Sequence, residues 1–156
     1  MSHSLASVTS DDLAAVRAGS PGVRLGVILP VGAVEQHGAH LPVTTDTDIG
    51  IGAAAALAAA LSATGRFRAW AAPAIPYGPV PGAGHTPGTA AVGFAELGSY
   101  LSAVAAGFAQ SGTWDFLVLV NAHAHNHGRA IEASSGVYER FRVPVSVIHV
   151  YDYLHL

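Results

Sequence analysis

Short apolar runs alternate with helix-forming segments along most of the chain, and this alternation restricts the fold more than any other feature. Each run is short enough for a buried strand and is bounded by Gly, Pro or polar residues. The runs are Val23–Pro30, Phe67–Ala72, Phe116–Val120 and Val143–Val150. Strands that alternate with helices form a parallel sheet covered by helices on both faces. The sequence therefore predicts an α/β fold, a three-layer α/β/α sandwich with a mostly parallel sheet.

The segments between these runs are predicted to be helices or shaped loops. Capping sequences such as Ser10-Asp-Asp and Thr45-Asp46-Thr47 begin helices. The predicted helices are Ser10–Arg17, Thr45 to about Ser62, Phe94–Gln110 and Gly128–Arg142. Two connections, Val31–Pro42 and Pro73–Gly88, are rich in Gly with His or Pro, and we expect loops there.

The composition limits the class of protein. The 156 residues are enough for one domain, expected to span residues 1–156, with a core of its own. Hydrophobic residues make up 51% of the chain and charged residues 11%, against roughly 25% charged in an average soluble domain. So few charges leave apolar surface for another subunit to cover. We expect a homo-oligomer, with a hexamer among the arrangements considered.

The charges and the missing residue types exclude several functions. The net charge is −3 and the seven basic residues are scattered Arg, whereas nucleic-acid binding requires a clustered basic face. Without Lys there is no Schiff-base chemistry, and without Cys there are no disulfides or Cys-type zinc sites. No targeting segment is evident, and the apolar stretch Ile49–Leu61 is short for a membrane span. We expect a cytoplasmic protein that binds neither nucleic acid nor membrane.

The first candidate site lies in the loop after the first apolar run. Three of the chain's ten carboxylates, Glu35, Asp46 and Asp48, fall within fourteen residues together with His37 and His40. Glu35 and His37 point the same way if this loop is extended, and Asp46 begins the next helix. Carboxylates and imidazoles of this kind suit a pair of divalent ions. The alternative is that the histidines are solvated and the aspartates only cap the helix, which we favour for Asp48.

The second candidate site directly follows the third apolar run. His123, His125 and His127 occupy alternate positions, and alternate residues share a face in extended backbone, so the first two are placed to face one ion or two adjacent ions. For this cluster alone, a His-rich surface turn is the alternative. The C-terminal ends of parallel strands form one ligand-binding edge of a sheet. We therefore expect Glu35 and His123 on neighbouring strand ends.

Other polar residues are weaker candidates. His85 lies in a loop able to line the pocket, although a lone histidine is more often structural. No serine has the G-x-S-x-G context of a nucleophile, and the HExxH, Walker A and G-x-G-x-x-G motifs are absent. Tyr151, Asp152, Tyr153 and His155 follow the last apolar run at the same edge, where they either complete the pocket or form a tail.

Three sequence blocks resemble those of the creatininase (creatinine amidohydrolase) family, in that family's order. They are LPVGAVEQHGAHLPVTTD at Leu29–Asp46, PAIPYG at Pro73–Gly78 followed by HTPGT at His85–Thr89, and VNAHAHN at Val120–Asn126. The resemblance covers essentially the whole chain. It implies a creatininase-like α/β/α sandwich with two divalent ions, zinc or manganese with iron as a further option. It also implies hydrolysis of small cyclic amides or formamides.

The resemblance also assigns roles by motif position. Glu35 and His123 would hold one metal ion, His37 would hold the other, and Asp46 would bridge the two. His125 stands where creatininase has a glutamate ligand of the second ion, so we expect it to take that role. The residues assigned to catalysis are His85 and His127, and those assigned to substrate binding are Tyr77, Thr89, Asn121 and Asn126.

The chain departs from the family pattern at two further points. Ala122 replaces the usual Gly of the third block. We also expect the chain to lack a C-terminal segment that supplies relatives with pocket wall and acid–base groups. The favoured function is metal-dependent hydrolysis of a C–N bond in a small cyclic amide or formamide-like substrate. The alternatives are a ring-closing or dehydrating biosynthetic enzyme on the same centre, and a non-catalytic metal-binding subunit partnered with a full-length relative.

Overall fold

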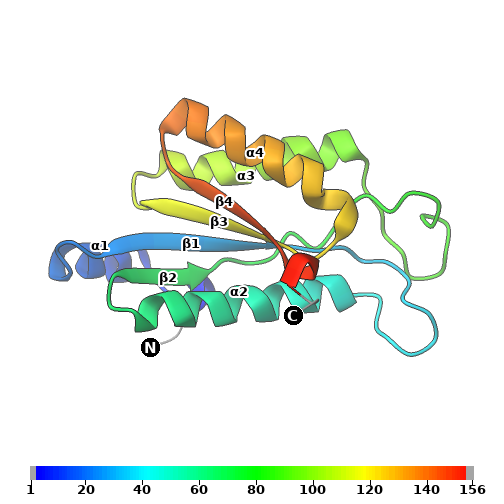
Figure 1. Cartoon of the computed structure of the whole chain (residues 1–156), viewed down its shortest axis with the longest axis horizontal. Coiled ribbons are helices and arrows are strands. Elements are labelled where there is room, and N and C mark those ends of the chain that lie inside the picture. Colours follow the sequence, from blue (N-terminus) through cyan, green and yellow to red (C-terminus); the bar gives the residue numbers. More distant parts are fainter. Residues whose placement is uncertain (1–2, 154–156) are drawn as a thin grey trace.

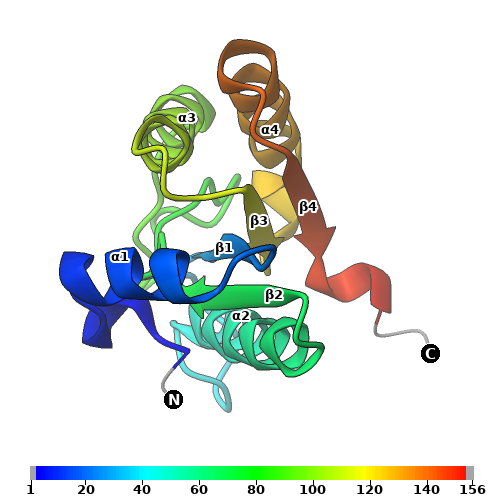
Figure 2. The ribbon, with the colours of Figure 1, turned by 90° about the vertical axis from the view of Figure 1, so that its left-hand side faces the viewer.

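The computed structural model describes residues 3–153, which form three layers (Figures 1 and 2). The elements, in chain order, are η1 (Leu5–Ser7), α1 (Ser10–Gly19), β1 (Arg24–Val31), α2 (Thr45–Ala63), β2 (Phe67–Ala71), α3 (Phe94–Gln110), β3 (Phe116–Asn121), η2 (Ala124–Asn126), α4 (His127–Phe141), β4 (Val145–His149) and η3 (Val150–Tyr153). The middle layer is a four-stranded sheet of order β2-β1-β3-β4, in which every described pairing is parallel. The predicted α/β/α sandwich is confirmed.

The two faces of the sheet pack against different helices. Successive residues of a strand point to opposite faces of the sheet. Leu25, Val27 and Leu29 of β1 therefore lie on one face, and Ile28 lies on the other. The first face packs against α1, α3 and α4, and the second packs against α2 (Figure 2). Because β1 and β3 are buried on both sides, they appear in the sequence as continuous apolar runs rather than alternating ones.

Helix α2 packs closely on the sheet through small residues. Ala54 and Ala58 are fully buried against Ile28 and Val118. The helix begins at Thr45 as predicted and ends at Ala63, one residue past the predicted end near Ser62. Among the described helices, α2 alone is long and apolar enough to cross a membrane by length and composition. Its buried residues, Asp46, Thr47, Gly50, Ala54 and Ala58, face the sheet and the candidate site, and 28% of the apolar window is buried.

The predicted boundaries agree with the structure to within two residues. Helix α3 matches its prediction, and β1 runs one residue past Pro30, to Val31. Strand β4 begins at Val145 rather than Val143. Pro144 has no N–H to donate, and only its carbonyl joins β3, by accepting from the amide of Leu117.

The register brings three strand ends together. Val31 of β1 pairs with Asn121 of β3, which pairs with His149 of β4. The first turn of α2 lies against the exit of β1, where a Cβ on Gly32 would lie 2.5 Å from the Cα of Thr47. The Thr47 hydroxyl also donates to the carbonyl of Ala33 at 2.9 Å. These contacts place the start of α2 beside the ends of β1 and β3.

Candidate metal centre

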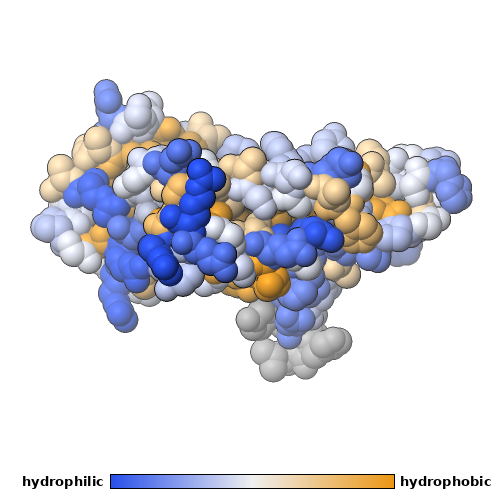
Figure 3. Space-filling view, turned by 90° about the horizontal axis from the view of Figure 1, so that it is seen from above, coloured by the Kyte–Doolittle hydropathy of each residue, from blue (hydrophilic) through white to orange (hydrophobic). Residues whose placement is uncertain are grey.

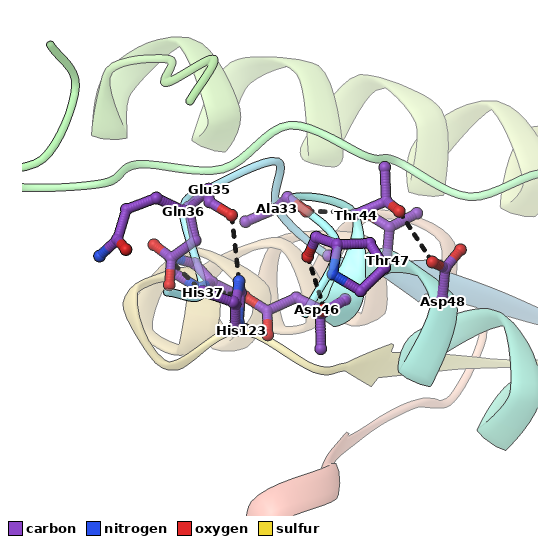
Figure 4. Close-up of polar contacts among 12 residues, drawn as sticks. Ala33, Glu35, Gln36, His37, Thr44, Asp46, Thr47, Asp48 and His123 are labelled. Carbon is purple, nitrogen blue, oxygen red and sulfur yellow. Dashed lines mark hydrogen bonds and ion pairs between the residues drawn. The ribbon is translucent and has the colours of Figure 1, made fainter. Parts of the chain in front are cut away.

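Four ionisable side chains point toward one another at the C-terminal edge of the sheet (Figure 4). Glu35 and His37 lie in the loop after β1, Asp46 lies in the first turn of α2, and His123 follows β3. One potential ligand atom from each of the first three lies within 4.8 Å of the others. The Nδ1 atom of His123 lies 4.0 Å from Oε2 of Glu35. Since β1 and β3 are paired, the prediction that Glu35 and His123 lie on neighbouring strand ends is confirmed.

Asp46 is the centre of this cluster and is only 2% exposed. Its Oδ2 lies 2.9 Å from Nδ1 of His123, and its Oδ1 lies 3.3 Å from Nε2 of His37. The hydroxyl of Tyr151 donates a hydrogen bond of 2.9 Å to Oδ1. Each carboxylate oxygen therefore faces a different imidazole.

The far nitrogen of each imidazole is held by a backbone carbonyl. His37 Nδ1 lies 3.0 Å from the carbonyl oxygen of Glu35, and His123 Nε2 lies 2.8 Å from that of Pro79. A carbonyl oxygen can only accept, so these two nitrogens carry the protons. In the neutral tautomer the nitrogen that faces Asp46 then has a lone pair and no proton. A metal cation between each of these nitrogens and Asp46 would make both contacts favourable.

The protonation equilibria favour charge separation within the cluster. Burial by itself raises the pKa of Asp46, but hydrogen bonds from His123 and Tyr151 and the charges of His123 and His37 lower it below its usual value. Burial lowers the pKa of His123, but its bonds to Asp46 and Pro79 and the nearby Glu35 charge raise it overall. An anionic carboxylate beside a cation is therefore the preferred state.

Tyr151 remains a hydrogen-bond donor across the physiological range. Its burial and its contact with the Asp46 carboxylate raise the pKa of the Tyr151 hydroxyl to about 12. The phenol therefore stays protonated and donates to Asp46 Oδ1 at 2.9 Å.

The donor set fits a divalent metal ion. Two carboxylates and two imidazoles suit zinc or manganese, which take nitrogen and oxygen ligands. Metal-binding histidines characteristically donate their other ring N–H to a carbonyl or carboxylate, as His37 and His123 do here. The buried carboxylate of Asp46 turns one oxygen toward each imidazole.

Asp48 and His40 lie outside this cluster. Asp48 is exposed in the first turn of α2 and accepts a hydrogen bond of 2.8 Å from the Thr44 hydroxyl (Figure 4). This is the helix-terminal position that the sequence favoured for it. His40 is exposed in the loop that precedes the helix.

His125 lies at the margin of the centre. The expectation of extended backbone from His123 to His125 is wrong, because Ala124–Asn126 form the 3-10 turn η2. The His125 side chain is exposed, with its ring centroid 5.2 Å from that of His123 and 6.5 Å from that of Phe94. A role for His125 as a ligand of the second ion stays a prediction.

The two asparagines assigned to substrate binding are buried and bond to the protein itself. Asn121 Oδ1 accepts from the backbone amide of His123 at 3.1 Å, and Asn121 Nδ2 lies 3.1 Å from His149 Nδ1. Asn126 Nδ2 donates to the carbonyl of Gly32 at 2.9 Å. Asn126 Oδ1 has no hydrogen-bond partner among the described residues. Both side chains therefore hold the backbone around the cluster.

The other assigned residues lie in the surrounding loops and turns. The Thr89 hydroxyl accepts from the amide of Gln36 at 3.0 Å, so this bond connects the loop after β2 to the loop after β1. Tyr77 is 49% exposed, and His85 is exposed in the same long loop. His127 begins α4, exposed, with its ring 5.4 Å from that of His149. The catalytic and substrate-binding roles of these residues stay predictions.

Two contacts of the cluster were not predicted from the sequence. The Pro79 carbonyl that fixes His123 carries no sequence signature. The hydroxyl of Tyr151 donates to Asp46. From the sequence, Tyr151 was expected either to complete the pocket or to belong to a tail. The only signal was its position after the last strand at the same edge. Asp152 is exposed, and His155 lies outside the described residues.

Comparison with known proteins identifies the family. The sequence profile of creatininase, described as creatinine amidohydrolase, matches residues 7–154. The chain belongs to the creatininase family. The resemblance of its three sequence blocks is thereby confirmed, and these blocks include the loop, helix start and strand end that carry the cluster.

Individual creatininase-family proteins share both fold and sequence with the chain. The solved structure named Creatininase Mn has a TM-score of 0.82 and 25% sequence identity to this chain. The match covers 99% of this chain and 60% of the chain in that structure. A creatininase variant complexed with creatine gives the same values. The mycofactocin precursor peptide peptidase of Mycolicibacterium smegmatis is 37% identical over 100 residues, which are 64% of this chain and 40% of the peptidase. The chain thus spans less than two thirds of the length of these relatives.

Proposed function

We propose that the chain is a metal-dependent hydrolase that cleaves an amide C–N bond at a binuclear zinc or manganese centre. One observation carries the proposal. Two imidazoles, each held at its far nitrogen by a carbonyl, face separate oxygens of the buried Asp46 carboxylate. A pair of cations would fit between these imidazoles and the carboxylate. Relatives named Creatininase Mn and a Zn-Zn type creatininase support these metals.

The proposed ligands follow from the geometry and from the family motif. Glu35, Asp46 and His123 would hold one ion, and His37, Asp46 and His125 would hold the other. When bound, such ions lower the pKa of a water molecule and polarise a substrate carbonyl.

The protein's own groups determine how a substrate reaches this centre. The side chains of Asp46 and His123 are 3% and 5% exposed, whereas those of His37 and Glu35 are 19% and 23% exposed. The cluster is therefore closed on the Asp46 side and open on the Glu35 side. A substrate carbonyl would approach from the open side.

The proposed substrate is a small cyclic amide or a formamide-like compound. A peptide is the second candidate, because the relative with 37% identity is named a precursor peptide peptidase. All of these contain the same C–N bond next to a carbonyl, so one centre would serve for each. Ring closure, the reverse reaction, remains the alternative on the same centre.

A reconstitution assay tests the proposal. Chelator-treated protein would be reloaded with zinc or manganese and incubated with a lactam, a formamide and a short peptide, with product amine measured. We expect hydrolysis by loaded wild type, none by Asp46→Asn, and wild-type rates from Asp48→Asn. The last variant makes the same chemical change at an exposed carboxylate two residues away. Protein that binds two ions but cleaves none of the substrates would favour the non-catalytic subunit, and protein that binds no metal would refute the proposal.

We also propose that copies of this chain assemble into a homo-oligomer. Only 11% of its residues are charged, and α2 exposes Ile49 and Ile51, which are 37% and 46% exposed. Polar and apolar residues are interspersed on the opposite face, above α3 and α4 (Figure 3). The outer face of α2 is the surface that we propose contacts another copy.

A further inference from the structure

Tyr151 touches the cluster from an element that the three family blocks do not include. It lies in η3, the turn that follows β4 at the C-terminal ends of the strands (Figure 1). Its hydroxyl donates to Asp46 Oδ1 at 2.9 Å. Its ring lies edge-on to that of His149, with centroids 5.4 Å apart and planes at 74°. The end of β4 thus reaches across the sheet edge to the first turn of α2.

The position of this hydroxyl determines how Asp46 is oriented. A carboxylate rotates freely about its terminal bond, since that torsion has broad minima. His123 holds Oδ2 at 2.9 Å, but His37 approaches Oδ1 only to 3.3 Å. The bond from Tyr151 is therefore the shortest contact on Oδ1 and completes a two-point grip on the carboxylate. Each carboxylate oxygen has two lone pairs, so Oδ1 retains one that faces His37.

We infer that Tyr151 is a positioning residue of the metal centre, which orients Asp46 so that Oδ1 is presented to the cation on the His37 side. This inference rests on the proposed function, because it concerns the same centre. Tyr151 contacts neither ion in this arrangement and acts through Asp46. Removal of the hydroxyl should therefore lower the binding affinity for the ion at His37 more than the affinity for the ion at His123. Loss of a group that orients a metal ligand typically lowers metal affinity roughly 10–100-fold.

Metal titration of the folded protein tests the inference directly. Calorimetric titration of metal-free protein with zinc would compare wild type, Tyr151→Phe and Tyr100→Phe. Tyr100 is 59% exposed on α3, so its variant controls for the same chemical change away from the cluster. We expect two ions per chain in all three proteins, with one of the two affinities in Tyr151→Phe lowered at least about tenfold. The visible spectrum of the cobalt-loaded protein should change in Tyr151→Phe and stay unchanged in Tyr100→Phe.

Three outcomes would overturn the inference. Equal affinities in wild type and Tyr151→Phe would mean that the hydroxyl does not position Asp46. Tighter binding by Tyr151→Phe would mean that it competes with the ion for Oδ1. Wild type that binds no ion would overturn both the inference and the proposed function, whereas two ions bound equally by both proteins would overturn the inference alone.

A double-mutant cycle in metal-free protein provides a second test that does not depend on loading. Thermal unfolding with chelator present would be measured for wild type, Tyr151→Phe, Asp46→Ala and the double variant. If Tyr151 acts through the Asp46 carboxylate, the two changes should be non-additive, because the second removes a group that has already lost its partner. Additive shifts in unfolding temperature would overturn the inference, since the hydroxyl would then act elsewhere.

Discussion

Substitution of Gly32 by alanine should destabilise the protein and displace the start of α2. A Cβ at this position would lie 2.5 Å from Thr47 Cα, 2.6 Å from its Oγ1 and 2.7 Å from its backbone nitrogen. Carbon atoms in contact prefer separations of about 3.5–4.0 Å, so the two backbones must separate by roughly 1 Å. Two of the three contacted atoms belong to backbone, so a change of rotamer cannot relieve the clash. Gly32→Ala therefore forces apart the exit of β1 and the first turn of α2.

The expected magnitude follows from two contributions. Overpacking of this kind costs about 1–3 kcal/mol. The bond from the Thr47 hydroxyl to the Ala33 carbonyl would also be strained, and a bond of that type contributes about 0.5–1.5 kcal/mol. A loss of about 2–4 kcal/mol in the free energy of unfolding corresponds to a fall in Tm on the order of 4–16 °C for a chain of this size. Because Asp46 precedes Thr47, zinc affinity should also fall at least about tenfold.

Gly50→Ala is the matched control for this prediction. Its Cβ would lie 3.5 Å from the Cβ of Ala122 and 3.6 Å from that of Pro30, which are ordinary contacts. Because Gly50 lies inside α2, alanine there should raise stability by about 0.5–1 kcal/mol. Scanning calorimetry of the three metal-free proteins, followed by zinc titration, gives both measurements. A Gly32→Ala protein with wild-type Tm and wild-type affinity would show that the close approach to Thr47 does not position Asp46.

Three further predictions concern metal content, pH and assembly. Metal analysis of His125→Ala should show one tightly bound ion per chain where wild type has two; two ions in both proteins would exclude His125 as an essential ligand. Asp115 accepts from Leu25 N at 2.7 Å and Arg17 at 2.9 Å, and although burial raises the pKa of Asp115, these bonds lower it overall. Its contribution is present above the unfolded pKa of about 3.9 and is lost as pH falls from there through the lowered folded pKa. By thermal unfolding, Asp115→Asn should therefore cost about 1–2 kcal/mol at pH 7 and progressively less as the pH is lowered below about 3.9; a cost independent of pH would contradict this. Light scattering should give an oligomer that Ile51→Asp dissociates, and a wild-type monomer of 15.8 kDa would rule out self-association.

The elements could be predicted because their signals are local. β1 and β3 are buried on both faces, so each is an unbroken apolar run that differs from the helices around it. The capping sequence at Thr45 and the proline at position 144 mark element ends within two residues. The backbone of η2 was predicted wrongly, because a His-x-His pattern is equally compatible with an extended segment and with a 3-10 turn. That difference of a single turn decides where the side chain of His125 points.

The sequence by itself determined which chemical groups the centre could use and at which edge of the sheet they would gather. With no Cys and no Lys, only His, Asp, Glu and backbone oxygen remained as ligands, and parallel strands bring their C-terminal ends together. Only the tertiary structure decided that Asp46 turns one oxygen to each imidazole and that Tyr151 holds one of them. It also decided which backbone carbonyls, those of Glu35 and Pro79, lie beside the far ring nitrogens of His37 and His123. The physical reason is that every residue carries a backbone carbonyl, so the sequence cannot distinguish the one that lies within hydrogen-bonding distance of a ring nitrogen from all the others.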